Sequence, residues 1–154
     1  MKAAELLVRC LENEGVGYIF GIPGEENLEL MDALRDSSIR FVTTRHEQGA
    51  AFMADVHGRL TGRAGVCLST LGPGATNLIT AVADANMDHA PLVAISGQAG
   101  THRLHKESHQ VLDLELIFQH ITKYSSRLLT PNIIPEVIRK AFMQAQLEKA
   151  GASF

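Results

Sequence analysis

The sequence predicts an α/β fold, in which a doubly wound, mostly parallel sheet carries helices on both faces and forms a single domain over residues 1–154. Helical and strand patterns take turns along the chain. This repeated order is typical of parallel sheets, because each strand needs a crossover to reach its neighbour. The strands predicted after residue 64 are continuous apolar runs, the pattern of strands covered on both faces.

The first half of the chain predicts three helices and two strands. Apolar residues recur at helical spacing in three segments, and glycines that favour a helix end, Gly15 and Gly62, follow the first and the third. The turn Gly21-Ile22-Pro23-Gly24 follows the first strand. The predicted helices span residues 2–14, 26–35 and 46–61, and the predicted strands span 18–20 and 39–43.

The second half predicts three more strands and three more helices. After Gly97 the pattern breaks into a polar segment, 99–110, and Pro135 opens the last helix because proline is favoured in a first helical turn. The predicted strands span residues 65–70, 91–96 and 124–129, and the predicted helices span 75–87, 112–118 and 135–149.

The composition is that of an ordinary globular domain and argues against two classes of partner. Hydrophobic residues make up 45% and charged residues 20%, with a net charge of −3. Acidic and basic residues are interspersed, so we expect no binding of nucleic acid or of a membrane surface. No apolar run is long enough to cross a bilayer and no signal sequence is recognisable, which favours a cytoplasmic protein. Cys10 and Cys67 form no CxxC pair and are expected to be buried, reduced thiols.

Glu47 stands at the start of the third predicted helix, at the sheet edge where the turns after parallel strands gather. The positive end of the helix dipole stabilises a carboxylate there whatever its function. Small residues follow it at helical spacing: Ala50, Ala51, Ala54 and Gly58. Gly49 and Gly58 each cost about 1 kcal/mol relative to alanine in a helix, which indicates close packing against another backbone. If that neighbour is a partner helix, Glu47 enters an interface where partial desolvation suits proton exchange.

A glycine-rich turn joins the strand 65–70 to the helix that follows it. Its sequence is Thr70-Leu71-Gly72-Pro73-Gly74-Ala75-Thr76-Asn77. Amides at a helix start bind phosphate, so a phosphate site is one interpretation. The turn has neither the GxGxxG pattern nor the lysine of a P-loop, and a tight turn that needs a flexible backbone explains its glycines equally well.

Three histidines in the polar segment, His102, His105 and His109, have a loosely metal-like spacing. No cysteine and no clear helix organises them, so we expect no metal site in this chain. Ser69 lacks the sequence context of a nucleophile elbow, and no serine hydrolase site is predicted.

Five motifs together resemble the N-terminal pyrimidine-binding domain of thiamine-diphosphate-dependent enzymes of the acetolactate synthase group. In chain order they are Phe20-Gly21-Ile22-Pro23-Gly24, Arg45-His46-Glu47-Gln48-Gly49-Ala50-Ala51, Gly72-Pro73-Gly74-Ala75-Thr76-Asn77, Pro91-Leu92-Val93-Ala94-Ile95-Ser96-Gly97-Gln98 and Ile121-Thr122-Lys123. The motifs occur in the right order over nearly the whole chain, which makes the set far more specific than any one of them.

The resemblance implies that Glu47 hydrogen-bonds N1′ of the cofactor's aminopyrimidine. That contact would favour the imino tautomer, whose 4′ nitrogen takes the proton from thiazolium C2 before the cofactor attacks pyruvate or another 2-keto acid. The resemblance also implies a pyrimidine pocket in place of the phosphate site considered above. Its lining residues are Pro23, Gly24, Thr70, Gly72, Pro73 and Asn77.

The pair His109-Gln110 is informative within this family. Related decarboxylases tend to carry paired histidines here and biosynthetic acetolactate synthases carry Phe-Gln, so His-Gln is most similar to synthases of the catabolic type. We expect Gln110 to face the substrate. The implied reaction is decarboxylation of pyruvate and condensation with a second 2-keto acid, in branched-chain amino acid biosynthesis or in acetoin formation.

The sequence contains nothing that resembles the Gly-Asp-Gly to Asn motif for magnesium and diphosphate. The resemblance places that function in a C-terminal domain, beyond a central domain, with a flavin left open. We therefore expect residues 1–154 to be one domain of a longer enzyme, a homodimer or tetramer, with no turnover alone. The alternatives are the pyrimidine-binding subunit of a two-subunit 2-keto acid decarboxylase, or a non-catalytic interaction domain, against which an intact Glu47 argues.

Overall fold

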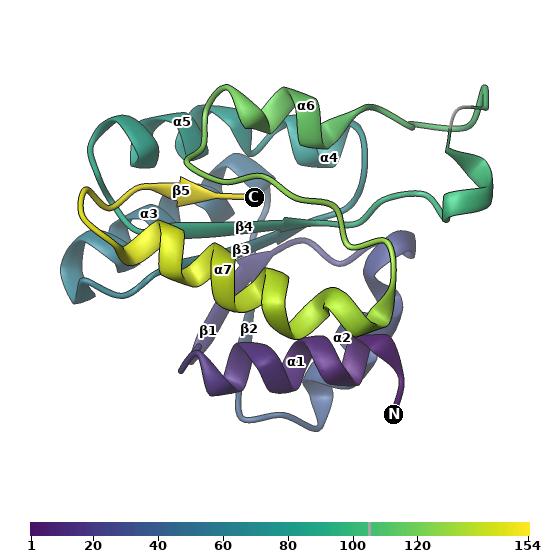
Figure 1. The fold of residues 1–154 in the computed structure, drawn as a ribbon, viewed down its shortest axis with the longest axis horizontal. Helices are drawn as coiled ribbons and strands as arrows, with labels where there is room; N and C mark the ends of the chain where they lie inside the picture. The colour runs from purple at the N-terminus through teal and green to yellow at the C-terminus, as the bar shows by residue number, and fades with distance from the viewer. Residues whose placement is uncertain (105) are drawn as a thin grey trace.

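The computed structural model describes residues 1–104 and 106–154 and confirms the predicted α/β architecture (Figure 1). Five strands form a parallel sheet in the order β2-β1-β3-β4-β5. They are β1 (Tyr18–Gly21), β2 (Arg40–Thr43), β3 (Gly65–Ser69), β4 (Leu92–Ser96) and β5 (Ala152–Ser153). Because β1 lies between β2 and β3, the sheet extends in both directions from its first strand, which is the predicted doubly wound topology.

Helices cover both faces of this sheet (Figure 1). One face carries α1 (Ala3–Asn13), α2 (Leu28–Arg35) and α7 (Ile134–Gln146). The other carries α3 (Glu47–Thr61), α4 (Pro73–Thr76), α5 (Ile79–Met87) and α6 (Leu114–Gln119). The described residues also form the short 3-10 helices η1 (Glu25–Asn27), η2 (Thr101–Arg103) and η3 (Pro131–Ile133). Every residue of β3 is buried, as its unbroken apolar sequence predicts.

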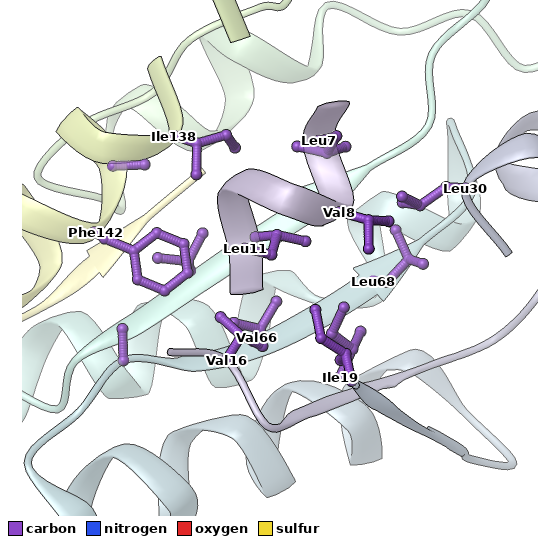
Figure 2. Packing of buried hydrophobic residues seen from close by; sticks show 14 of the residues in the cluster. Leu7, Val8, Leu11, Val16, Ile19, Leu30, Val66, Leu68, Ile138 and Phe142 are labelled. Atoms are coloured by element: carbon purple, nitrogen blue, oxygen red, sulfur yellow. The ribbon is translucent and has the colours of Figure 1, made fainter. Parts of the chain in front are cut away.

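Large aliphatic side chains fill the layer between the sheet and α1, α2 and α7 (Figure 2). Leu11 of α1 and Ile19 of β1 are fully buried, and Phe142 of α7 closes the layer at one end. Burial of each such side chain stabilises the fold by about 1.5–3 kcal/mol. This layer fixes β1 and β3, two of the strands whose turns contribute to the candidate site.

The opposite layer is thin because small residues line the inner face of α3. Ala50, Ala51 and Ala54 are fully buried in it. A Cβ on Gly58 would overlap the carbonyl oxygen of Pro91, so the helix lies directly on the chain that leads into β4. The small-residue stripe therefore packs inside this molecule, which corrects the expectation that it meets a partner helix. Gly49 has no such neighbour, since a Cβ there would point into open space.

The structure differs from the predicted elements most clearly in its C-terminal part and around Asn77. Residues 124–129 are not a strand: Tyr124 makes a single parallel bridge to Ser153, because β5 is only two residues long and offers few partners. The short β5 carries no periodic pattern that could have predicted it. The helix predicted over 75–87 is divided into α4 and α5, which turns Asn77 toward α3. The last helix ends at Gln146, three residues early.

Two expectations from composition can be compared with the fold. In the part of the chain that the structure describes, no helix combines the length and the apolar character needed to cross a bilayer. Both cysteines are free thiols; Cys67 is buried as expected, whereas Cys10 is only partly buried on α1.

Candidate functional site

The candidate site lies at the carboxyl edge of the sheet, where the turns after β1, β2 and β3 meet. The chain leaves β1 toward the face covered by α2, and leaves β2 and β3 toward the face covered by α3 and α5. The direction of winding thus reverses between β1 and β3. In open α/β sheets this reversal point is where ligands bind.

Glu47 begins α3 at this edge, and its carboxylate is half-buried and held on one side. Nδ2 of Asn77 donates a hydrogen bond of 2.9 Å to Oε2 of Glu47, and joins the start of α3 to the link between α4 and α5. Among the residues described, no group donates a hydrogen bond to Oε1. The arrangement therefore presents one fixed carboxylate with one oxygen available.

The first turn of α3 is fixed by the residue before Glu47. Nδ1 of His46 accepts a hydrogen bond of 3.1 Å from the backbone N–H of Gln48, so this imidazole occupies the capping position that serine or asparagine usually takes. The bond requires the tautomer with the proton on Nε2, because Nδ1 acts as the acceptor. The cap gives a partner to one backbone N–H that the helix itself leaves unpaired, and it thereby stabilises the turn that carries Glu47.

Two glycines bring the turns together around Thr70. A Cβ on Gly24 would overlap Cγ2 of Thr70, so the turn after β1 touches the turn after β3 only because no side chain intervenes. A Cβ on Gly74 would lie 2.6 Å from Oγ1 of Thr70 and 3.4 Å from Oε1 of Glu47. The glycines therefore leave a smooth wall beside the open carboxylate oxygen.

The backbone of Thr70 is fixed by two hydroxyl groups at the ends of neighbouring strands. Oγ of the buried Ser69 and Oγ of Ser96 lie 3.0 Å and 2.9 Å from the carbonyl oxygen of Thr70, both within hydrogen-bond distance. Oγ of Ser96 is also 2.8 Å from the carbonyl oxygen of Gly97. These contacts align the carboxyl ends of β3 and β4, and explain serines at positions where a purely apolar strand is expected.

Gln110 also reaches this edge of the sheet, through its backbone. Gly72 has a positive φ of 55°, and a Cβ on it would lie 2.8 Å from Cβ of Gln110. Gln110 itself has a φ of 57°, which is uncommon for a residue with a side chain and is found more often at functional sites. Its side chain is exposed, as are those of Pro23 and Pro73. The residues predicted for the pocket thus lie on turns at one edge of the sheet.

Among the described residues, no three His, Cys, Asp or Glu side chains come together in a group that could hold a metal ion. His102 and His109 are exposed on the segment after β4. His105, the third histidine of that group, lies outside the described residues.

A cavity of about 310 Å³ lies away from these turns, between β4 and α7. Apolar groups of Ile95, Ile138 and Phe154 contribute to its lining, together with the loop that begins at Gly97. None of Glu47, Thr70 or Asn77 lines it. We place the candidate site at the turns, where the polar groups converge, and not at this cavity.

Sequence reasoning missed the residues that support the site from behind, above all Asn27, Ser69 and Ser96. Asn27 follows Gly24 by three residues, the spacing at which a side chain in the first helical turn can accept from the backbone N–H of the residue before the helix, and that spacing was the available signal. The two serines have no signal in a single sequence, because a hydroxyl at a strand end forms ordinary turns as well.

Fold and site together define a class of protein: a parallel α/β domain that brings a carboxylate and glycine-rich turns together at the reversal point of its sheet, where ligands bind in such folds. The chain belongs to the thiamine pyrophosphate enzymes, since its residues 1–117 match the family described as the thiamine pyrophosphate enzyme, N-terminal TPP binding domain.

Similar proteins carry the name acetolactate synthase. The probable acetolactate synthase large subunit of Methanocaldococcus jannaschii is 45% identical over 151 residues, which cover 98% of this chain and 26% of that protein. The acetolactate synthase of Bacillus subtilis is 46% identical over 153 residues, 99% of this chain and 27% of that protein. The catabolic acetolactate synthase of Raoultella terrigena is 43% identical over 151 residues, which cover 98% of this chain and 27% of that protein. The chain therefore spans about a quarter of the length of these relatives.

Proposed function

We propose that residues 1–154 are the N-terminal, pyrimidine-binding domain of a longer acetolactate synthase that depends on thiamine diphosphate. One observation carries the proposal: Glu47, with Oε2 held by Asn77 and Oε1 open, stands at the reversal point of the sheet in a chain of the thiamine pyrophosphate enzyme family. The greater length of the relatives supports the presence of further domains, which would hold the diphosphate and Mg²⁺.

The residues at the carboxyl edge fit an aminopyrimidine ring. Such a ring offers a nitrogen, N1′, to a carboxylate and a flat face to its surroundings. Oε1 of Glu47 would hold a proton at N1′, and Gly74, which has no side chain beside that oxygen, would leave room for the ring. Thr70, Gly72 and the neighbouring prolines would complete the wall. Asn77 would keep the carboxylate in one orientation as the proton moves.

When bound, thiamine diphosphate supplies a nucleophilic carbon that adds to a 2-keto acid and accepts the electron pair released on decarboxylation. The part of this chain in that reaction is to place the cofactor and to move a proton at Glu47. We assign Gln110 to the substrate, because its backbone packs on Gly72 and its exposed carboxamide can donate to a carboxylate or a keto oxygen. The substrates would be pyruvate and a second 2-keto acid.

The compartment, the pathway and the oligomeric state of this enzyme belong to the same proposal. We infer a cytoplasmic enzyme of branched-chain amino acid biosynthesis or of acetoin formation, because the similar proteins include both an acetolactate synthase large subunit and a catabolic acetolactate synthase. We infer a homodimer or tetramer from the exposed apolar side chains on the outer face of α3. This face replaces the buried stripe of small residues as the proposed contact.

The test is Glu47→Gln in the full-length enzyme. An amide keeps the size of the side chain and can still bond to N1′, but it cannot exchange its proton there. We expect deuterium exchange at C2 of bound thiamine diphosphate to slow by about a hundredfold or more, measured by NMR after acid quench. Acetolactate formation from pyruvate should fall in parallel.

Two comparisons make this test specific. Glu47→Asp keeps the exchangeable proton on a shorter side chain and should retain more of the exchange rate than Glu47→Gln. The exposed Glu29 on α2 provides a control, since Glu29→Gln should leave the rate unchanged. An unchanged rate in Glu47→Gln would remove this residue from the mechanism.

A further inference from the structure

We propose that Asn27 is a positioning residue for the pyrimidine pocket, which it serves by holding the turn that carries Pro23 and Gly24. The inference rests on the proposed function, because it concerns residues assigned there to the pocket wall. Asn27 itself lies behind that wall, and its side chain is not among the groups assigned to contact the ring.

The side chain of Asn27 is 4% exposed, and both ends of its carboxamide are bonded within the same turn. Oδ1 accepts a hydrogen bond of 2.9 Å from the backbone N–H of Gly24, and Nδ2 donates one of 3.3 Å to the carbonyl oxygen of Ile22. The two bonded residues flank Pro23. One amide thus fixes the backbone on both sides of the exposed proline, which has no N–H of its own to make such a bond.

The turn that Asn27 fixes is in contact with the turns after two other strands. Gly24 packs against the side chain of Thr70, which follows β3. On the other side, a Cβ on Gly97, which follows β4, would lie 3.0 Å from Cβ of Glu26. A small shift of this turn would therefore be transmitted to Thr70, whose hydroxyl lies beside Gly74, the residue that also borders the open oxygen of Glu47.

A carboxamide is the group that meets both requirements of this site. It presents an acceptor and a donor from one short side chain, whereas leucine presents neither and aspartate presents acceptors only at neutral pH. Loss of either bond leaves a poorly solvated backbone group without its partner, so the turn would adopt other conformations to satisfy it. We expect that change to appear as weaker cofactor binding.

The experiment compares Asn27→Leu and Asn27→Asp with the wild-type full-length enzyme. We expect the KM for thiamine diphosphate to rise about tenfold in Asn27→Leu, the equivalent of one lost buried hydrogen bond, while kcat at saturating cofactor stays within about twofold. Asn27→Asp keeps the acceptor for the Gly24 N–H, so its KM for thiamine diphosphate should lie between those of the wild type and of Asn27→Leu. Hydrogen exchange at the Gly24 amide should be faster in Asn27→Leu even without cofactor.

Asn86 supplies the matched control. Its Oδ1 accepts a hydrogen bond of 3.1 Å from the backbone N–H of Ala152, so it is also a partly buried amide that holds a backbone segment, but at β5 and away from the pocket. Asn86→Leu should lower thermal stability without raising the KM for thiamine diphosphate. An equal rise in both variants would show a general effect of lost stability and would overturn the inference.

The two proposals fail in distinguishable ways. If wild-type enzyme binds thiamine diphosphate and Glu47→Gln slows C2 exchange, but Asn27→Leu leaves the KM and the Gly24 exchange unchanged, the positioning role of Asn27 alone is overturned. If the wild-type enzyme binds no thiamine diphosphate, both are overturned. Should Asn27→Leu not fold, the KM of Asn27→Asp for thiamine diphosphate decides, because this variant loses only the bond to the carbonyl oxygen of Ile22; an unchanged KM would overturn the inference.

Discussion

At the scale of single residues, the pair formed by Asn77 and Glu47 is the most consequential contact. Both residues are among those that the family resemblance assigns to the site, but their mutual hydrogen bond becomes visible only in three dimensions, because 30 residues separate them. A hydrogen bond to a charged group contributes about 1.5–3 kcal/mol. This bond therefore stabilises the contact between α3 and the α4–α5 link as well as fixing the carboxylate.

Asn77→Asp tests that contact with almost no change of volume. The variant places a second carboxylate where Nδ2 now donates to Glu47, so we expect repulsion to lower the free energy of unfolding by about 1–2 kcal/mol at neutral pH. Urea denaturation at neutral pH measures the loss, with Asn86→Asp as the control; a loss of the same size in both variants would contradict the repulsion.

Cys67 gives a prediction about alkaline pH. Burial in β3 raises the pKa of its thiol from the ordinary 9.0 to about 12. Below pH 9 the thiol is protonated in the folded and unfolded chain alike. Between pH 9.0 and about pH 12 only the unfolded chain releases the proton, so the free energy of unfolding falls as pH rises. Wild-type protein should lose about 2 kcal/mol more than Cys67→Ala between roughly pH 8.5 and 10.5.

Guanidinium denaturation under reducing conditions measures this difference. Cys10→Ala is the comparison, because burial and the charge of Glu14 also raise the pKa of that thiol but Cys10 is only partly buried. The free energy of unfolding that Cys10→Ala loses at alkaline pH should stay closer to the loss of the wild type. Identical pH profiles for Cys67→Ala and wild type would show that the buried thiol ionises without cost.

At the scale of elements, α3 and α5 run side by side and are tied together at both ends. Asn77 and Glu47 join their beginnings. Near their C-terminal ends, Nε of Arg59 bonds to Oδ1 of Asp55 at 2.9 Å, and the two other guanidinium nitrogens bond to Asp84 at 3.0 Å and Asp88 at 2.9 Å. The pKa of Arg59 lies above its ordinary range, and the hydrogen bond with Asp55 contributes most to this rise.

Arg59→Met should lower the free energy of unfolding by about 2 kcal/mol, because it leaves the buried carboxylate of Asp55, 3% exposed, without its partner. We take a value below the range for fully buried pairs, since the arginine side chain is 36% exposed and water screens it. Arg35→Met is the control: its pairs with Asp32 and Asp36 are largely exposed, so the variant should leave the free energy of unfolding nearly unchanged. Equal effects of the two variants would contradict the role of burial.

The elements also show how far sequence patterns reach. Helical periodicity and unbroken apolar runs predicted the central strands and most helices, because those patterns report burial directly. The two-residue β5 and the divided helix around Asn77 were not predictable, since neither depends on periodicity: β5 is set by the edge of β4, and the division of the helix brings Asn77 to Glu47 over a long sequence separation. The stripe of small residues on α3 correctly indicated a close neighbour, but a pattern cannot say whether that neighbour belongs to the same molecule.

At the scale of the whole molecule, α3 presents an apolar outer face. Met53, Val56 and Leu60 follow one another at helical spacing and are 47%, 49% and 80% exposed. Met87, at the C-terminal end of the neighbouring α5, is 77% exposed. Contiguous exposed apolar side chains of this kind mark surfaces that bind another protein surface. Since α3 also carries Glu47 at its first turn, a contact on this face would bring a neighbouring molecule close to the candidate site.

We therefore expect the protein to self-associate through this face, and sedimentation velocity should show a mass that rises with concentration. Met53→Lys places a charge in the contact and should shift the protein toward the monomer. Met143→Lys is the matched control, because Met143 is 45% exposed but lies on α7 on the opposite side of the sheet, and its variant should associate as the wild type does. A wild-type protein that stays monomeric at high concentration would remove α3 as the interface. Weakening by both variants alike would assign the association to general apolar exposure and not to this helix.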